Sequence, residues 1–340
     1  MNIQADSRFL QLKAWLQRQL QTQDFSIAPA SADASFRRYF RVAHGDESLI
    51  AMDAPPDKED SHPFVRVAGY LNAMQINAPR VLAENYEDGF FLLADLGHRH
   101  YLSVLNAQNA DQLYADAMQV LIQLQQKGAV YLRGLPAFDE AMLLREMHLF
   151  RDWYVQAHLG LNLDETQSKV LEDTFAFLAE QALAQPRVFV HRDYHSRNLM
   201  YSPAVGRNPG VLDFQDAVAG PLTYDLVSLL RDCYIDWPPA QVEKWVAAYH
   251  RQLHQAGLFT TVSLEQFMRW FDLMGIQRHL KASGIFARLN HRDGKPGYLD
   301  DIPRTLGYIL QVAPAYAPMQ AFIKLLDDLG ISARLQQESA

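Results

Sequence analysis

Two segments, VFVHRDYHSRNLM (residues 188–200) and GVLDFQDA (residues 210–217), carry the strongest signal about the fold of this sequence. Each begins with a short apolar run that predicts a buried strand and then continues into acidic and amide side chains. A charge placed directly after a buried strand is costly unless it is paired or binds a cation. Asp193, Asn198 and Asp213 are therefore the first candidates for functional residues.

The composition excludes several classes of protein. A chain of 340 residues predicts one large domain or two, and its 49% hydrophobic and 21% charged content is ordinary for a globular protein. The net charge of −8 argues against nucleic-acid binding driven by bulk charge. The single cysteine, Cys233, excludes an internal disulfide framework and is typical of a reducing compartment. Since no signal peptide or membrane-spanning apolar run is evident, we expect a soluble, cytoplasmic protein.

The order of predicted elements differs between the two ends of the chain. Residues 1–97 predict a helix, two strands, a second helix and a hairpin that turns at Gly89. Residues 98–340 predict mainly helices, interrupted by short strands within 188–214. The expected helices of this second part are 111–127, 140–158, 165–184, 241–256, 264–289 and 304–328. We therefore expect an α+β protein with a small lobe built on an antiparallel sheet and a large, mainly helical lobe.

The residues after the two apolar runs match the requirements of phosphoryl transfer from ATP. This reaction needs a carboxylate to accept the proton of the acceptor and oxygen ligands to hold Mg²⁺ on the phosphates. HRDYHSRN matches the catalytic-loop pattern H-R-D-x-x-x-x-N, which makes Asp193 the candidate base and Asn198 a metal ligand. Asp213 would be the second metal ligand. A lone Asp after a strand is often only a turn residue, but three such residues in this order rarely arise by chance.

A zinc site is a weaker interpretation of the same loop. His191 and His195 are four residues apart, as in the zinc motif H-E-x-x-H. Arg192 occupies the position where that motif requires a glutamate, and no third ligand is evident. We therefore interpret His191 as a buried orienting residue.

The segment GPLTYDLVSLLRD, which follows Asp213, resembles the aminoglycoside phosphotransferase and choline kinase-like superfamily, whose members have a protein-kinase-like fold. Only seven residues separate Asp213 from Pro221, too few for the activation loop of a protein kinase. Asp225 resembles an acidic residue that braces the catalytic loop in this superfamily. The alternative is that Asp225 only interacts with the dipole of its own helix.

A more specific resemblance extends over most of the chain. It is carried by SADASFRRYFRV, AMDAPP, PFVRVAGYL, FFLLADLG, HRDYHSRN, LDFQDA and QRHLKASGIFARLNHRDGKPGYL. Together these segments are similar to the bacterial anomeric kinases of N-acetylmuramate and N-acetylglucosamine. The resemblance implies ATP-dependent phosphorylation of the C1 hydroxyl of an amino sugar in peptidoglycan recycling, with a product that a sugar-1-phosphate nucleotidyltransferase would use. It also implies that residues 1–97 bind the nucleotide and that residues 98–340 carry the catalytic loop and the sugar site.

The resemblance places the nucleotide in the first lobe. FFLLADLG is similar to the strand and hinge that meet adenine, which makes Ala94, Asp95 and Leu96 the expected edge. SADAS is similar to the turn that covers the phosphates but contains no glycine. Ser31 and Ser35 are the expected phosphate contacts of this turn, through hydroxyl and backbone N–H groups.

The cation that usually binds the phosphates is missing from its expected position. Met52 stands where kinases carry a strand lysine. Alternation along FRRYFRV places Arg38 on the same face as Phe40 and Val42, as a lone charge among apolar residues. We therefore predict that this face looks into the nucleotide site and that Arg38 contacts the phosphates, with Arg37 as the next candidate.

The acceptor site has the weakest signal. Arg278 and Lys281, three residues apart, share one helix face and are candidates for binding an anionic group of the sugar. Trp153 is a candidate platform for stacking against the sugar ring. A kinase of aminoglycosides or choline is the alternative enzyme, although such cationic acceptors would favour an acidic pocket. A nucleotide-binding pseudokinase is the alternative that has no catalytic activity.

Overall fold

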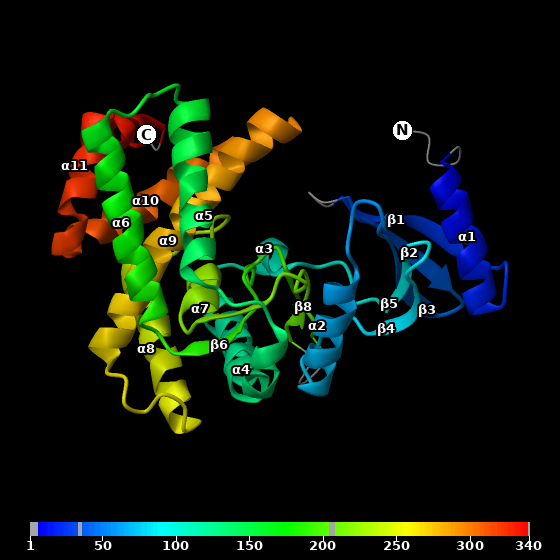
Figure 1. Cartoon of the computed structure of the whole chain (residues 1–340). Coiled ribbons are helices and arrows are strands. Elements are labelled where there is room, and N and C mark those ends of the chain that lie inside the picture. The colour runs from blue at the N-terminus through cyan, green and yellow to red at the C-terminus, as the bar shows by residue number, and fades with distance from the viewer. Residues whose placement is uncertain (1–5, 33–35, 204–207, 339–340) are drawn as a thin grey trace. The chain divides into compact units, whose positions relative to one another are not determined.

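The computed structural model describes residues 6–32, 36–203 and 208–338. The chain divides into two compact units: the first comprises Met1–Arg99 with Leu199–Asp216, and the second comprises His100–Asn198 with Ala217–Ala340. The first unit contains an antiparallel sheet and the second is mostly helical, as the labelled elements of Figure 1 show. None of the described helices is long and apolar enough to cross a membrane.

The first unit is built on a five-stranded sheet in the order β1-β2-β3-β5-β4, with every neighbouring pair antiparallel. Its strands are β1 (Ser26–Ala32), β2 (Arg38–His44), β3 (Glu47–Asp53), β4 (Val81–Asn85) and β5 (Phe90–Ala94). The predicted hairpin between β4 and β5 turns at Gly89, which has φ 72°. A Cβ atom there would lie 1.9 Å from the carbonyl oxygen of Ala54, so only glycine fits this turn.

Strand β1 was missing from the sequence prediction. Its sequence, SIAPASA, is rich in small residues and contains Pro29, which cannot donate to a neighbouring strand. The strand lies at the edge of the sheet, and its pairing with β2 shifts between Pro29 and Ser31. An edge position tolerates a proline that would exclude the same sequence from the middle of a sheet.

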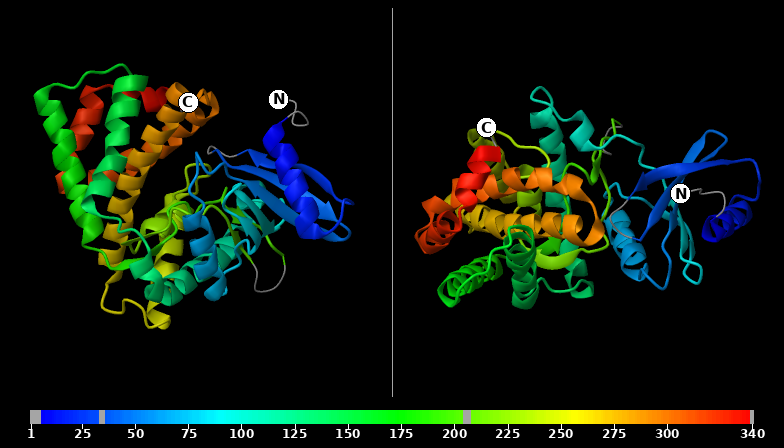
Figure 2. Two further views of the ribbon diagram at one scale, coloured as in Figure 1. Left: turned by 45° about the vertical axis from the view of Figure 1, so that its right-hand side comes forward. Right: turned by 90° about the horizontal axis from the view of Figure 1, so that it is seen from above.

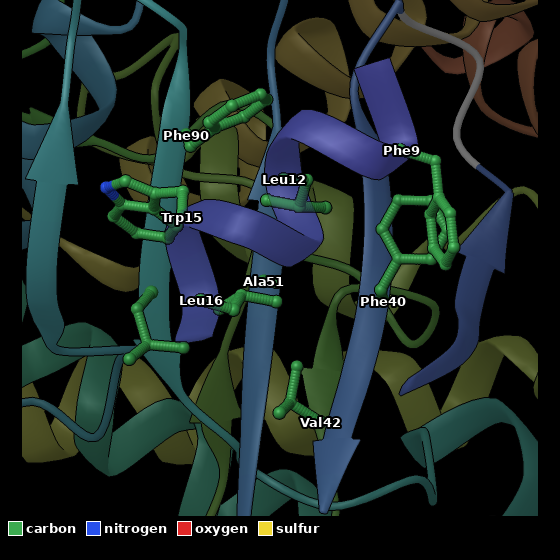
Figure 3. Close-up of a cluster of buried hydrophobic side chains, with 9 residues drawn as sticks. Phe9, Leu12, Trp15, Leu16, Phe40, Val42, Ala51 and Phe90 are labelled. Carbon is green, nitrogen blue, oxygen red and sulfur yellow. The ribbon is translucent and has the colours of Figure 1, made fainter. Parts of the chain in front are cut away.

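Helix α1 (Ser7–Leu20) covers one face of this sheet. Asp6 caps the helix by accepting a hydrogen bond from the backbone N–H of Arg8 at 3.0 Å. The apolar side of α1 forms one buried cluster with side chains of the central strands, drawn in Figure 3. The buried members of this cluster are Phe9, Leu12, Trp15, Leu16, Phe40, Val42, Ala51, Phe90 and Leu92. The face of β2 that carries Phe40 and Val42 is therefore the face that binds α1.

Residues Leu199–Asp216 belong to the first unit, although the predicted boundary at 97/98 assigned them to the second lobe. Strands β7 (Leu199–Met200) and β8 (Gly210–Val211) form a small hairpin in this segment. The N–H of Val211 donates to the carbonyl of Asn77 at 2.7 Å. Phe214 stacks on Phe64 of α2 (His62–Ala73) with 5.0 Å between ring centroids. These long-range contacts are not visible in a linear pattern.

The second unit is organised around the 30-residue helix α9 (Leu264–Asp293). Helices α5, α6, α7 and α10 and the π-helical segment η3 pack against it, and Figure 2 shows α9 in yellow to orange beside the green helices. The other elements of this unit are α3 (Tyr101–Val104), α4 (Ala110–Gly128), η2 (Ala129–Gly134), α5 (Glu140–Leu149), η3 (Phe150–His158), α6 (Glu165–Leu183), β6 (Arg187–Val190), β9 (Val218–Pro221), α7 (Tyr224–Leu230), α8 (Pro239–Gln255), η4 (Pro296–Asp301), α10 (Ile302–Val312), η5 (Ala313–Ala315), η6 (Ala317–Met319), α11 (Gln320–Asp328) and α12 (Ile331–Glu338).

Two of the predicted helices are interrupted. The expected helix 304–328 is divided into α10 and α11, because Pro314 and Pro318 lie between them and cannot continue an α-helix. The expected helix 140–158 changes to π-helical winding at Phe150. At that level α9 comes very close: a Cβ atom on Gly284 would lie 2.3 Å from the backbone of Leu149. Gly284 thus allows α9 to cross where the winding changes.

Candidate active site

The predicted catalytic loop follows strand β6, which pairs with β9 in an antiparallel ribbon. Asp225, near the start of α7, accepts hydrogen bonds from the backbone N–H groups of His191 at 2.7 Å and Arg192 at 2.9 Å. Arg192 has a positive φ of 80°, an uncommon conformation for this residue type. The buried carboxylate of Asp225 therefore stabilises this backbone conformation just before Asp193.

A second buried carboxylate holds the other end of the loop. Asp232 accepts from the backbone N–H of Ser196 at 2.9 Å and from that of Tyr234 at 3.0 Å. Within the loop, the side-chain amide of Asn198 donates to the carbonyl oxygen of Asp193 at 3.0 Å. The residues predicted as base and metal ligand are thus directly linked.

Cationic side chains surround Asp193. Burial by itself would raise the pKa of its carboxyl group, but nearby positive charges, first that of Lys281 and then those of Arg192 and Arg278, lower the pKa below its ordinary value. Asp193 is consequently ionised at neutral pH.

Lys281 belongs to a buried ion-pair cluster around Glu146 in the second unit. Glu146 of α5 forms ion pairs with Arg192 and, at 3.2 Å, with Lys281. Lys281 also donates to the hydroxyl of Tyr224 at 3.0 Å, and Gln277 donates to Glu146 at 3.2 Å. The ammonium group of Lys281 therefore has two partners within the protein.

Arg278 has a different environment, although only 6% of its surface is exposed. Its Nη1 lies 3.5 Å from the sulfur of Cys233, and its Nε has no hydrogen-bond partner in the part of the chain that the structure describes. A buried guanidinium with weak partners is costly. Of the two cations predicted for the acceptor site, Arg278 is the one with hydrogen-bonding capacity left for a ligand.

Asp213 belongs to the first unit, whereas Asp193 and Asn198 belong to the second. It follows β8 and has a φ of 62°, which turns the backbone sharply at this residue. Gln215 donates to its carboxylate at 2.8 Å. The predicted order, a short strand followed by an acidic residue, is thus present at Asp213.

The predicted adenine edge lies at the end of β5. The N–H of Ala94 donates to the carbonyl of Arg80 at 2.9 Å, so the N–H donors of this edge are those of Asp95 and Leu96. The carboxylate of Asp95 accepts from the N–H of Gly97 at 2.8 Å and binds Arg41, so it holds the turn after the strand.

A cavity of about 350 Å³ lies at the opposite end of β5. Its lining includes Ala54, Gly89, Ser61 and Tyr86. Since Gly89 precedes β5 and Ala94 ends it, this cavity is separate from the predicted adenine edge.

The predicted orientation of Arg38 was wrong. The face of β2 that carries Phe40 and Val42 packs against α1, so Arg38 does not have the open surroundings that the prediction assumed. Its guanidinium pairs with Asp53 through Nε at 2.9 Å and also forms an ion pair with Asp6. These carboxylates neutralise the lone charge that motivated the phosphate assignment.

The structure does not test three other predicted site residues. Ser31 lies in β1 opposite Tyr39, and Ser35 falls outside the described residues. Trp153 lies half-buried in the π-helical segment η3. All three remain predictions.

Two further functional candidates, Asp232 and Glu146, are not evident from the sequence pattern. Asp232 lies seven residues after Asp225, a spacing of about two helical turns that could have drawn attention to it. Glu146 has no such signal, because its partners come from the catalytic loop and from α9.

Comparison with known proteins identifies the protein family. The model of the phosphotransferase enzyme family matches residues 26–259, and the chain belongs to this family. Among solved structures, an ethanolamine kinase from Plasmodium vivax has a TM-score of 0.61 at 12% identity, covering 91% of this chain and 88% of its own. A choline kinase from Streptococcus pneumoniae has a TM-score of 0.59 at 11% identity, covering 90% and 100%. These likenesses confirm the predicted α+β, kinase-like fold.

More similar relatives are found among characterised sequences. The N-acetylmuramate/N-acetylglucosamine kinase of Pseudomonas aeruginosa is 48% identical over 323 residues, which is 92% of this chain and 94% of the relative. Proteins of the same description from Pseudomonas putida and Neisseria meningitidis are 44% and 42% identical, covering 97% and 95% of this chain and 98% and 96% of their own. The predicted family resemblance is therefore confirmed over nearly the whole length.

Proposed function

We propose that this chain transfers the terminal phosphoryl group of ATP to the anomeric hydroxyl of N-acetylmuramate or N-acetylglucosamine. The catalytic loop is the observation that carries the proposal, because Asp225 and Asp232 hold it from both sides and Asp193 is ionised within it. Relatives at 42–48% identity are kinases of these two amino sugars. The alternative acceptors, aminoglycosides and choline, are cationic and would be repelled by the cations around Asp193.

In the proposed reaction Asp193 orients the sugar hydroxyl and accepts its proton as the oxygen attacks phosphorus. Asn198 and Asp213 would hold Mg²⁺, which neutralises charge on the phosphates. One carboxylate and one amide oxygen fit a magnesium ion, which keeps several water and phosphate ligands. The side-chain nitrogen of Asn198 is used by the Asp193 carbonyl, so its oxygen is the atom suited to the metal.

For the sugar we propose that Arg278 binds the carboxylate that distinguishes N-acetylmuramate from N-acetylglucosamine. Lys281, the other predicted cation, already pairs with Glu146 and Tyr224. The Nε–H of Arg278 has no hydrogen-bond partner among the residues that the structure describes, and a guanidinium suits a carboxylate. Trp153 remains our candidate for stacking on the sugar ring.

The cellular role follows from the product. A sugar 1-phosphate is a substrate for a nucleotidyltransferase, and we propose such an enzyme as the next step of peptidoglycan recycling. We expect both reactions in the cytoplasm, where ATP is available.

The test measures ADP release with a panel of amino sugars, aminoglycosides and choline, followed by phosphorus NMR of the product. Asp193→Asn should lower turnover about 10²–10⁴-fold while MgATP binding is retained. Phosphate on C6 instead of C1 would refute the anomeric assignment and leave a sugar kinase. Nucleotide binding without turnover on any acceptor would identify a pseudokinase instead.

A further inference from the structure

The first unit lacks the lysine with which kinases usually bind nucleotide phosphates. Met52 of β3 stands at that position, is fully buried, and lies between Tyr39 of β2 and Phe91 of β5. A nucleoside triphosphate still brings several negative charges, so another cation must approach it. This reasoning rests on the proposed nucleotide co-substrate.

The sheet register shows which side chains share the face of Met52. Phe40 and Ala51 are paired neighbours on the face that α1 covers. The neighbouring pair, Tyr39 and Met52, points to the opposite face, because side chains alternate along a strand. Arg37 lies directly before β2 and two residues ahead of Tyr39. Alternation continued by one residue beyond the strand gives it the same side as Tyr39. Only 8% of its surface is exposed.

Arg37 is held in place by an acidic partner. Its Nη2 lies 3.2 Å from Oε2 of Glu59, and both side chains are largely buried. The other carboxylate oxygen of Glu59 accepts a hydrogen bond from the backbone N–H of Phe36, also at 3.2 Å. Glu59 lies in the loop before helix α2, two residues ahead of the N-cap residue Ser61. One carboxylate thus fixes both the backbone and the side chain at the start of β2.

Arg37 and Glu59 form a cation–glutamate pair like the lysine–glutamate pair of protein kinases, but the two residues come from different structural elements. In protein kinases the cation comes from β3 and the glutamate from the following helix. Here the cation comes from the residue directly before β2, and the glutamate comes from the loop that leads into the helix. A guanidinium has five N–H donors, so Arg37 can keep Glu59 and still bind phosphate oxygens.

We propose that Arg37, oriented by Glu59, is the phosphate-binding cation of the nucleotide site. The neighbouring arginines are less suited to this role. Arg38 lies on the α1 face with Asp53 as its partner, and Arg41, in the middle of β2, is bound by Asp95. Arg66 of α2 is exposed and serves as the matched control.

The experiment measures nucleotide affinity by titration calorimetry on the full-length protein. Arg37→Met should weaken MgATP binding at least about tenfold, the scale of one charge-assisted hydrogen bond, while adenosine affinity stays unchanged. Arg37→Lys should recover part of the MgATP affinity. Glu59→Gln should give an intermediate loss, because it releases the orientation of Arg37 and retains its charge. Arg66→Met should bind MgATP like the unmodified protein, and thermal unfolding should show that all variants are folded.

The proposal is overturned if folded Arg37→Met and Arg37→Lys both bind MgATP with unchanged affinity. An equal loss of MgATP and adenosine affinity would also overturn it, since that pattern indicates a general distortion of the unit. Titration of the unmodified protein with MgATP and MgGTP separates this inference from the proposed function. If neither nucleotide binds, the proposed co-substrate is wrong; if one binds and Arg37→Met binds it equally well, only the role of Arg37 is wrong.

Discussion

Replacing Asp225 by asparagine tests whether this residue braces the catalytic loop. The carboxylate accepts the backbone N–H groups of His191 at 2.7 Å and Arg192 at 2.9 Å and is 2% exposed. An asparagine oxygen can accept one of these bonds, but its NH₂ group would face the other backbone N–H. A buried N–H left without an acceptor costs about 1–3 kcal/mol, and the remaining bond loses its charge assistance, which is worth about 1 kcal/mol. We therefore expect Asp225→Asn to lower the free energy of unfolding by about 2–4 kcal/mol.

The same substitution should also reduce catalysis. Arg192 keeps its positive φ only while the surrounding contacts hold it, so the backbone before Asp193 should relax. A displacement of about 1 Å at a reacting group can lower the rate about 10²-fold. Urea unfolding gives the stability change and ADP release gives kcat. Asp173→Asn, at a surface ion pair with Lys169, is the matched control and should change stability by less than about 0.5 kcal/mol.

A small effect would refute the bracing role of Asp225. If the residue only interacted with the helix dipole, the loss would be about 0.3–1 kcal/mol with nearly normal kcat. A loss in that range, with kcat unchanged, would mean that the two backbone hydrogen bonds do not position the loop.

Three further predictions concern the metal, the sugar and the pH dependence. Asp213→Ala should weaken MgATP binding as well as turnover, because a metal ligand is removed; unchanged affinity in calorimetry would remove Asp213 from the metal site. Arg278→Met should lower kcat/KM at least about tenfold more for N-acetylmuramate than for N-acetylglucosamine, and equal losses would point to a structural role. Burial opposes ionisation of Glu146, but the charges of Lys281 and Arg192 outweigh it and lower its pKa below the ordinary 4.5. A carboxyl group with a lowered pKa stabilises the fold at pH values above its ordinary pKa, and this stabilisation is lost as the pH falls. The stability difference between the unmodified protein and Glu146→Gln, measured by denaturant unfolding, should therefore shrink below about pH 4.5. A constant difference from pH 3 to pH 7 would contradict that ion pair.

The candidate catalytic residues were chosen from the sequence alone. Asp193, Asn198 and Asp213 follow two short apolar runs at spacings that phosphoryl transfer requires, and this information is local. The hairpin at Gly89 was also predictable, because its turn depends on a backbone conformation that favours glycine. The turn at Gly89 depends only on neighbouring residues in the chain, so the linear pattern was sufficient for it.

The tertiary structure decided which side chains meet. Alternation along β2 correctly separated Arg38 from Arg37, but the pattern is equally compatible with either face towards the nucleotide. Only the packing of α1 on Phe40 and Val42 shows that the face with Arg38 is covered, which contradicts the prediction for Arg38. The same limit applies to Glu146, whose partners Arg192 and Lys281 are 46 and 135 residues away in the sequence. The free energy gained by burying side chains depends on which surfaces folding brings together. The spacing of residues along the sequence does not show which surfaces these are.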